Sequence, residues 1–287
     1  MPFQFQQTAT TETTVKRLLD RFGVSHRLFM QLRDDQLITM NGRHVGNVAM
    51  HPGQTVTFEL PEEGGVTIAH GTLNIMYEDA NWLIVDKPTQ LASVPGPSNP
   101  DASLLNFVAG YLQQQGHENP SPAIMTRLDR DTRGLVLIAK HGFAQGRLMR
   151  MGDAAQLDKR YLAVASGIIP EQWGIVQAPL GRSADGIHQE IRLDGKAART
   201  DYDVLQRGQV ATLVRCHLLT GRTHQIRVHL ASLGHPLVGD TLYDGLKRED
   251  NAGQALIAVK LSFRDPFTNQ DISVSLPQPP EFTALLN

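Results

Sequence analysis

The sequence has a single cysteine, Cys216, and no long apolar segment among its 287 residues. One cysteine excludes an intramolecular disulfide and a zinc site built from a cysteine cluster. No segment is long and apolar enough to span a bilayer, and the start MPFQFQQTATTETTVKR lacks the basic region and apolar run of a signal peptide. Because 41% of the residues are apolar and 20% are charged, the composition is that of a folded protein. We therefore expect a folded, cytoplasmic protein with no membrane partner.

Several motifs that bind nucleotides, metals or acyl groups are also missing. Neither GxxxxGK[ST] nor GxGxxG occurs, so nothing indicates a nucleotide cofactor. A G-x-S-x-G elbow is absent, and Cys216 lies in an apolar, strand-like run, so a serine or cysteine nucleophile has no support. His224 and His229 are five residues apart on an expected helix, which places them on different faces and argues against zinc. We predict that the protein uses no metal and no cofactor.

A strong excess of positive charge, usual in proteins that bind nucleic acids, is missing as well. The chain has 27 basic and 29 acidic residues, a net charge of −2. The charges are unevenly distributed, however. Residues 1–50 carry six basic and four acidic side chains, residues 51–120 carry one and eight, and residues 121–160 carry eight and four. The near-neutral total therefore does not exclude a local positive surface.

The sequence predicts an α+β protein with a small front module over residues 1–62, a linker over 63–71 and a larger domain over 72–287. In the module, apolar residues at helical spacing from Val15 to Phe22 predict a helix, Ser25 can cap a second one, and Asn41-Gly42 predicts a hairpin turn. The linker begins with the sequence EGG.

The larger domain reads as short apolar strands separated by loops and a few helices. GLVLIAK, residues 134–140, is a continuous apolar run and predicts a central strand. Thr223 can cap a helix that has Ile226, Leu230 and Leu233 on one face. IAVKLSF and DISVSLP, joined by a turn-rich segment, predict a late hairpin.

The densest polar cluster is TRLDRDTRGLVLIAK, residues 126–140. Asp129 and Asp131 stand among arginines directly before the expected central strand. A carboxylate beside arginines stays ionised and can act as a nucleophile or a base. The alternative is a surface turn of mutually neutralising charges. A sugar hydrolase that uses both carboxylates is disfavoured, because two residues so close on one turn cannot readily flank a substrate.

Two further clusters could recognise a charged or aromatic ligand. Arg222 and Arg227, at the expected helix start, could hold an anion or orient a carboxylate, although they could equally form an ordinary solvated helix start. Lys159 and Tyr161 lie in DKRYLAVASG, where the ring could stack on a nucleobase while the charge meets phosphate. The alternative for Tyr161 is a half-buried strand tyrosine.

In this order, RLDRDTRGL, KRY, GRTHQIRVHL, GHP and GDTLY resemble the motifs of the RluA-type pseudouridine synthases, which isomerise uridine in structured RNA. YEDANWLIVDKP, residues 77–88, is similar to the strand that opens their catalytic domain, so the resemblance covers about residues 72–287. It implies a mixed, largely antiparallel sheet with flanking helices and a central cleft. It also implies an isomerase that needs no cofactor, acts on ribosomal or transfer RNA, and can work as a monomer.

The resemblance also implies a role for individual residues. Asp129 would be the catalytic aspartate and Arg227 its partner, Tyr161 would stack on the uracil, Ile226 would line the base pocket, and Arg127 would fill the space left by a flipped nucleotide. Thr126 and Arg133 depart from the family pattern, which has histidine and serine there. We expect activity to survive these departures, and Arg133 to add a phosphate contact.

The front module resembles the RNA-binding domain of the ribosomal protein S-four type. Phosphate contacts from such a domain would set orientation rather than sequence choice. The expected RNA-binding residues are Arg17, Arg21, Arg27, Arg33 and Arg43 in the module and Arg130, Arg133, Lys159 and Arg222 in the larger domain; the alternative for each is a solvated surface side chain. The alternative function is an RNA-binding or ribosome-assembly protein with weak or dispensable catalysis, and the presence of Asp129, Tyr161 and Arg227 together favours the enzyme.

Overall fold

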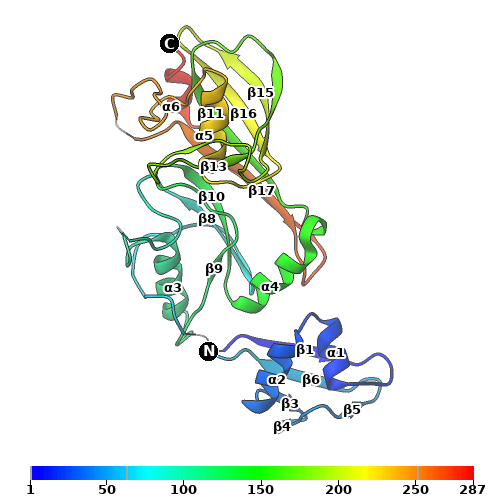
Figure 1. Ribbon diagram of the computed structural model, residues 1–287. Helices are drawn as coiled ribbons and strands as arrows, with labels where there is room; N and C mark the ends of the chain where they lie inside the picture. Colours follow the sequence, from blue (N-terminus) through cyan, green and yellow to red (C-terminus); the bar gives the residue numbers. More distant parts are fainter. Residues whose placement is uncertain (1, 63, 98, 251) are drawn as a thin grey trace.

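The computed structural model describes residues 2–62, 64–97, 99–250 and 252–287. Among these residues, a four-stranded sheet with the order β1-β6-β3-β4 forms the front of the chain, and a ten-stranded sheet runs β12-β15-β16-β11-β17-β10-β8-β7, with β18 on β17 and β9 on β10. Figure 1 shows the small sheet with α1 and α2 at one end of the molecule and the large sheet, with its helices, occupying the rest. The expected mixed, largely antiparallel sheet with flanking helices is confirmed, since β10 and β17 pair in parallel within an otherwise antiparallel ladder.

Short helices and strands alternate in the front of the chain. The hydroxyl of Ser25 accepts a hydrogen bond from the N–H of Leu28, and Asn41 and Gly42 both have positive φ, so the predicted cap and hairpin turn are confirmed. The elements are β1 (Gln4–Thr8), β2 (Thr13–Thr14), α1 (Val15–Arg21), α2 (His26–Asp34), β3 (Ile38–Met40), β4 (Arg43–His44), β5 (Ala49–Met50) and β6 (Thr55–Glu59).

The large sheet begins at β7 and is built around β10, which matches the predicted central strand. β10 lies between β8, antiparallel, and β17, parallel, and its residues from Gly134 onward are buried. The late hairpin is also confirmed as β17 and β18. The elements are β7 (Asn74–Glu78), β8 (Trp82–Lys87), α3 (Leu104–Gln114), β9 (Ala123–Ile124), β10 (Arg133–Ala139), α4 (Gly142–Met151) followed by a 3-10 turn (Gly152–Ala155), β11 (Asp158–Ser166), β12 (Trp173–Gln177), β13 (Leu180–Arg182), β14 (Gln189–Ile191), β15 (Arg199–Arg207), β16 (Ala211–Leu218), α5 (Gln225–Ser232), β17 (Leu256–Arg264), β18 (Asp271–Ser275) and α6 (Pro280–Ala284).

The start of α5 differs from the prediction. His224, not Thr223, is the residue before the helix; it has a left-handed backbone (φ 55°) and makes no side-chain cap. The side-chain oxygen of Gln225 instead accepts hydrogen bonds from the Thr220 hydroxyl (2.7 Å) and the Arg222 N–H (3.0 Å). The turn before α5 is therefore closed by an amide inside the helix, which leaves Thr223 without a capping role.

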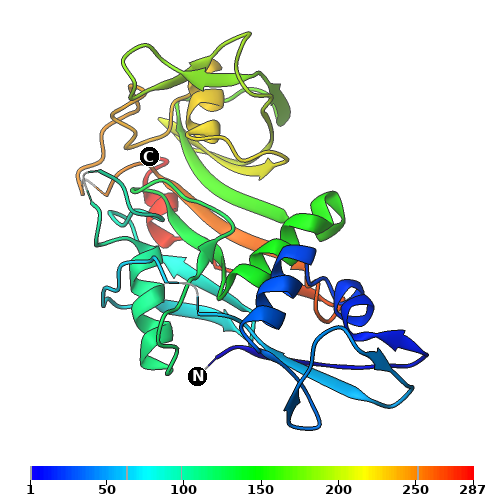
Figure 2. The ribbon, with the colours of Figure 1, turned by 60° about the horizontal axis from the view of Figure 1, so that its bottom comes forward.

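The front of the chain packs against the large domain through aromatic rings. Phe5 and Phe22 contact Phe143 of α4 and Phe267 of the β17–β18 turn, at centroid distances of 5.3 to 6.1 Å. The guanidinium of Arg147 lies 4.5 Å from the ring centroids of both Phe22 and Phe267 and donates to the carbonyls of Phe22 and Pro266. Figure 2 shows the same neighbourhood of α4 and the front helices from another side. The two parts thus share an apolar core.

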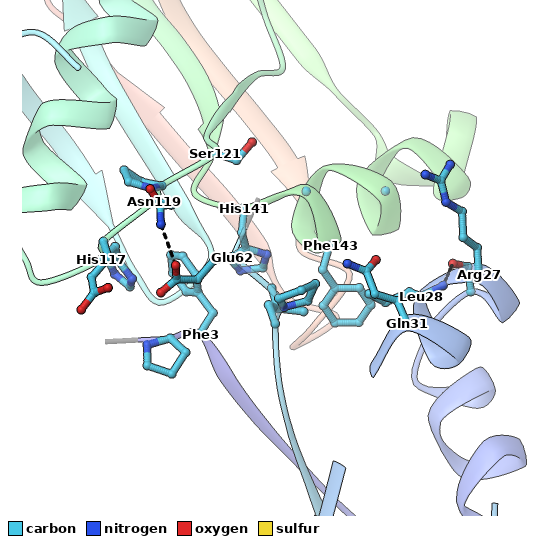
Figure 3. A pocket seen from close by; sticks show the side chains of 18 of the residues that line it. Phe3, Arg27, Leu28, Gln31, Glu62, His117, Asn119, Ser121, His141 and Phe143 are labelled. Atoms are coloured by element: carbon cyan, nitrogen blue, oxygen red, sulfur yellow. Dashed lines mark hydrogen bonds between the residues drawn. The ribbon is translucent and has the colours of Figure 1, made fainter. Parts of the chain in front are cut away.

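A cavity of about 400 Å³ lies at this junction. Figure 3 shows Phe3, His141 and Phe143 along one side of it, Arg27 and Gln31 of α2 at one end, and a hydrogen bond between Glu62 and Asn119 (2.6 Å) at the other. The division at 62 and 72 stays a prediction: residues 64–73 contain no helix or strand, and residue 63 lies outside the described residues. In the described part of the chain, no helix combines the length and hydropathy that crossing a membrane requires.

Candidate active site

Asp129 lies in the loop between β9 and β10, and hydrogen bonds fix the part of this loop that precedes it. The hydroxyl of buried Ser93 donates to the Leu128 carbonyl (2.7 Å) and accepts from the Leu128 N–H (3.0 Å). The hydroxyl of Thr126, also buried, accepts from the Leu137 N–H of β10 (2.8 Å). Thr126, one of the two departures from the family pattern, therefore anchors the loop to the sheet.

Lys87, at the end of β8, lies fully buried beneath the same loop. Its ammonium donates to the carbonyls of Pro88 (2.8 Å), Leu91 (2.7 Å) and Arg130 (3.1 Å). Burial lowers the pKa of Lys87 to about 8, and the charges of Asp131, Asp129 and Asp86 limit the decrease. The sequence analysis missed this residue, although it belongs to the quoted segment YEDANWLIVDKP.

The structure brings Arg227 of α5 next to Asp129. One guanidinium nitrogen, Nη1, donates to Asp129 Oδ2 at 3.2 Å. Nε and Nη2 donate to the two carboxylate oxygens of buried Asp240 at 2.7 and 2.8 Å, and the ring of Tyr243 lies 5.1 Å below the guanidinium carbon. Burial alone would lower the pKa of Arg227, but the hydrogen bonds and charges of Asp240 and Asp129 raise it. A rigid, permanently charged group therefore faces the Asp129 carboxylate.

Tyr161 lines the same cavity as Asp129 and follows an irregularity in the sheet. The register between β11 and β17 shifts between Arg160 and Tyr161, and such a bulge redirects the side chains that follow it. Tyr161 is buried, and burial together with the charge of Asp129 raises the pKa of its phenol, which stays protonated at neutral pH. A cavity of about 580 Å³ is lined by Asp129, Tyr161, Ile226 and Arg227, among others. Its volume is in the range of small-molecule binding sites.

Most, but not all, of the RNA-binding residues expected in the larger domain lie at this cavity. Arg127, Arg130 and Arg222 are exposed at the cavity, and half-buried Lys159 lines it. Arg222 donates to the Ala197 carbonyl (3.0 Å), and it lines the same cavity as Arg227, so an anion site shared by these two arginines stays a prediction.

Arg133 does not reach the cavity, so the phosphate contact expected from it is not supported. Its guanidinium lies 2.6 Å from the Glu281 carboxylate and over the Phe282 ring of α6. The five arginines expected to bind RNA in the front module, Arg17, Arg21, Arg27, Arg33 and Arg43, are exposed and lie outside this cavity.

Asp240, Tyr243 and His224 complete the site but were not assigned a role in the sequence analysis. His224 Nε2 lies 3.9 Å from Asp129 Oδ2, and its Nδ1 lies 2.9 Å from the Tyr243 hydroxyl. All three residues lie in the motifs GDTLY and GRTHQIRVHL, so these motifs could have indicated them individually. Among the described residues, no three side chains of the metal-binding types gather into a possible metal site.

A family model described as RNA pseudouridylate synthase matches residues 81–232, which include Asp129, Tyr161 and Arg227. The chain belongs to this family. The uncharacterized RNA pseudouridine synthase YjbO of Bacillus subtilis is 36% identical over 95% of this chain and 98% of its own length. Ribosomal large subunit pseudouridine synthase D of Nitrosomonas europaea is 39% identical over 75% of this chain and 64% of its own length, and that of Haemophilus ducreyi is 34% identical over 88% and 83%.

A solved structure, human RNA pseudouridylate synthase domain containing 1, superposes with a TM-score of 0.60 at 27% identity and covers 76% of this chain and 90% of its own. The sequence and structure comparisons agree on the same family. The chain is an RNA pseudouridine synthase, an isomerase that converts uridine into pseudouridine in RNA.

Proposed function

We propose that this pseudouridine synthase modifies ribosomal RNA of the large subunit, with Asp129 as its catalytic carboxylate. The RNA target is supported by the similarity to relatives named ribosomal large subunit pseudouridine synthase D. The single observation that supports the catalytic role is the placement of the Asp129 carboxylate in a cavity between Arg227 and Tyr161. Transfer RNA is the other structured RNA that such an enzyme could modify, and the same experiment distinguishes the two.

The reaction explains why one carboxylate can suffice. The bond between C1′ and N1 of uridine breaks, the uracil turns, and a bond forms between C1′ and C5, so substrate and product are isomers. The carboxylate can add to the base, add to the ribose or remove a sugar proton. In each case it must be ionised and aimed at the nucleoside, which the Nη1–H of Arg227 favours. Confinement in the cavity keeps the detached uracil in place.

The other cavity residues hold the target nucleotide. Tyr161 stacks on the uracil, Ile226 forms the apolar side of its pocket, and exposed Arg127 occupies the gap left in the RNA when the nucleotide is flipped out. Every residue named here comes from one chain, so a monomer can carry out the reaction. In this proposal, the front module orients the RNA through its exposed arginines in the cytoplasm.

The test compares pseudouridine maps of total RNA from cells that produce the wild-type enzyme, Asp129→Asn or Asp131→Asn. We expect Asp129→Asn to abolish one or more pseudouridines in large-subunit ribosomal RNA while the purified variant still binds that RNA. Asp131→Asn is the matched control, because it removes a carboxylate from the same loop. That carboxylate pairs with the exposed Arg130 (3.1 Å). Full modification by Asp129→Asn would disprove the catalytic role, and a loss confined to transfer RNA would overturn the target.

A further inference from the structure

His224 has an unusual backbone conformation for a residue other than glycine. Its φ of 55° and ψ of 19° lie in the left-handed region, which non-glycine residues rarely adopt and which is often found at functional sites. The side chain does not cap α5. Instead, the ring packs edge to face on Tyr243, with centroids 5.7 Å apart. The backbone therefore places an imidazole at the cavity where a helix cap would ordinarily stand.

The hydroxyl of Tyr243 connects His224 to Gln189 of β14. The hydroxyl accepts from the Gln189 N–H (2.9 Å), and its only proton can be donated to the Gln189 carbonyl (3.3 Å) or to His224 Nδ1 (2.9 Å). When the carbonyl takes this proton, His224 carries its own proton on Nδ1. Nε2, which lies 3.9 Å from Asp129 Oδ2 beside the cavity, is then the nitrogen that can accept a proton, and the inference uses this tautomer.

The surroundings keep this imidazole neutral. Burial is the largest cause that lowers the pKa of His224, and the charges of Arg227 and His188 lower it further. The charges of Asp129 and Asp240 act in the opposite direction without reversing the result. Tyr243 adds a neutral phenol, because burial raises its own pKa. At neutral pH, His224 therefore presents an uncharged nitrogen that can accept a proton.

The isomerisation needs such an acceptor in its last step. When C5 of uracil has bonded to C1′, C5 still holds its hydrogen, and the product forms only when that proton leaves. C5 is then bonded to the sugar carbon at the centre of the reaction, so it lies close to the atoms on which Asp129 acts. A group whose nitrogen lies 3.9 Å from the Asp129 carboxylate is close enough to reach it.

We propose that His224 is a second catalytic residue, which removes the C5 proton through Nε2 after the new bond has formed. The C5–H bond breaks and its electron pair forms the C5=C6 double bond. The electron pair of the C6=N1 double bond moves onto N1, which takes up a proton from water, and the imidazolium releases its proton to water. The inference rests on the proposed role of Asp129, because it requires the reaction to take place at that carboxylate. It adds a residue that acts after Asp129 has acted.

The test is a single-turnover measurement on target RNA that carries hydrogen or deuterium at C5 of the target uridine. His224→Asn is the main variant, because asparagine tolerates the left-handed backbone and removes only the ring. We expect an unchanged dissociation constant for RNA, a rate lower by about 100-fold or more, and a primary deuterium isotope effect that is small in the wild type and large in the variant. His235→Gln, which removes a nearby histidine outside the cavity, serves as the matched control.

The pH dependence gives an independent readout. The wild-type rate should decrease at acidic pH, in a range below the ordinary pKa of histidine, because the imidazole becomes protonated there, and His224→Asn should lose this acidic limb. A normal rate in His224→Asn overturns the proposal. A slow rate without a C5 isotope effect and with an unchanged pH profile also overturns it, because the residue would then be structural. Activity of Asp129→Asn would instead disprove the proposed function.

Discussion

Asp240 holds Arg227 through Nε and Nη2, which leaves Nη1 to contact Asp129. Both partners of the Arg227–Asp240 pair are buried, with side-chain exposures of 8% and 1%. Removing one partner of a buried ion pair leaves an uncompensated charge, which costs about 3 kcal/mol or more. A comparable pair, Arg248–Asp250, has an exposed carboxylate, for which the cost is about 1 kcal/mol or less. Variants of the two pairs therefore distinguish the effect on stability of burying the carboxylate from the effect of removing its charge.

We expect Asp240→Ala to lower the free energy of unfolding by about 3 kcal/mol and the single-turnover rate by about tenfold or more, because Arg227 is no longer held in one orientation. Asp250→Ala should change neither by much. Urea unfolding and single-turnover assays of both variants provide the measurement. Equal stability and equal rates for the two variants would contradict the role of Asp240.

At the scale of residues, the sequence was sufficient to predict a contact when the motif resemblance implied both partners. It was insufficient when one partner comes from a loop whose path is not local. The motif resemblance implied the Arg227–Asp129 pair, which the structure brings together at 3.2 Å. The pairing with Asp240 depends on how residues 233–240 fold back over α5, and local sequence does not specify that path. The pairing of Arg133 with Glu281 was not predictable for a related reason, since Glu281 lies near the other end of the chain.

At the scale of elements, β10 was predictable because a continuous apolar run of that length is typical of a buried strand. Its parallel pairing with β17 was not, because the pairing joins distant segments. The close approach requires Gly134: it has a φ of 110°, and a Cβ there would lie 2.4 Å from the Ala258 carbonyl oxygen. β1 was missed because QFQQT contains one apolar residue, Phe5, which is too little for a recognisable alternation.

The helix α5 also shows what hydropathy alone cannot predict. Its first six residues are buried, including Gln225, Arg227 and His229, where the sequence indicated one apolar face. Each polar side chain has a partner: Gln225 donates to the Arg199 carbonyl (2.9 Å), and His229 contacts the Thr200 hydroxyl (2.9 Å). A helix with polar side chains can be buried when each of these side chains has a hydrogen-bond partner. The partners are brought close only in the folded chain.

His141 caps α4 and packs on the front strands, so its protonation should weaken the fold. Its Nδ1 accepts from the Ala144 N–H (3.1 Å), and its ring lies 4.4 Å from that of Phe3. Burial, with smaller effects from His117 and Lys140, lowers the pKa of His141 from 6.5 to about 3. Between these values the unfolded chain binds the proton and the folded chain does not. Stability therefore falls as the pH decreases from 6.5 towards 3.

His141→Asn keeps a helix-capping side chain without the titrating ring. We expect the wild type to be more stable than this variant at pH 7, and the difference to shrink steadily as the pH is lowered to 4. Urea unfolding at a series of pH values provides the measurement, with the exposed His44→Asn as control. A difference that stays constant across this range would show that His141 does not titrate as its burial requires.

At the scale of the whole molecule, the front of the chain and the large domain act as one packed unit. Phe143 and Phe267 belong to the same apolar cluster as Leu19, Phe29 and other residues of the front module. The sequence indicated two parts joined by a linker but could not indicate this shared core, because the rings that meet there are far apart in the chain. If the front module binds RNA as proposed, this shared core would present the RNA to the active site in a fixed geometry rather than on a free tether.

The near-neutral total charge requires the positive contacts with RNA to be few and local, so single arginines should have measurable effects. Arg21 and Arg33 were expected to contribute alike, but Arg33 is engaged by Asp34 at 2.6 Å. Exposed Arg21, at the end of α1, is not found in any ion pair among the described residues. Binding of phosphate by Arg33 must therefore compete with a neighbouring carboxylate, whereas binding by Arg21 need not.

We accordingly expect Arg21→Ala to weaken RNA binding several-fold and to reduce the slope of log K against log salt by about 1, with Arg33→Ala giving a smaller change in both. The single-turnover rate at saturating RNA should equal that of the wild type in each case, because neither residue lies at the catalytic cavity. Salt titrations of RNA binding and rate measurements on the two variants test this ranking. A larger salt effect in Arg33→Ala would show that the RNA displaces Asp34, and a lower rate at saturation would place the front module in the chemical step.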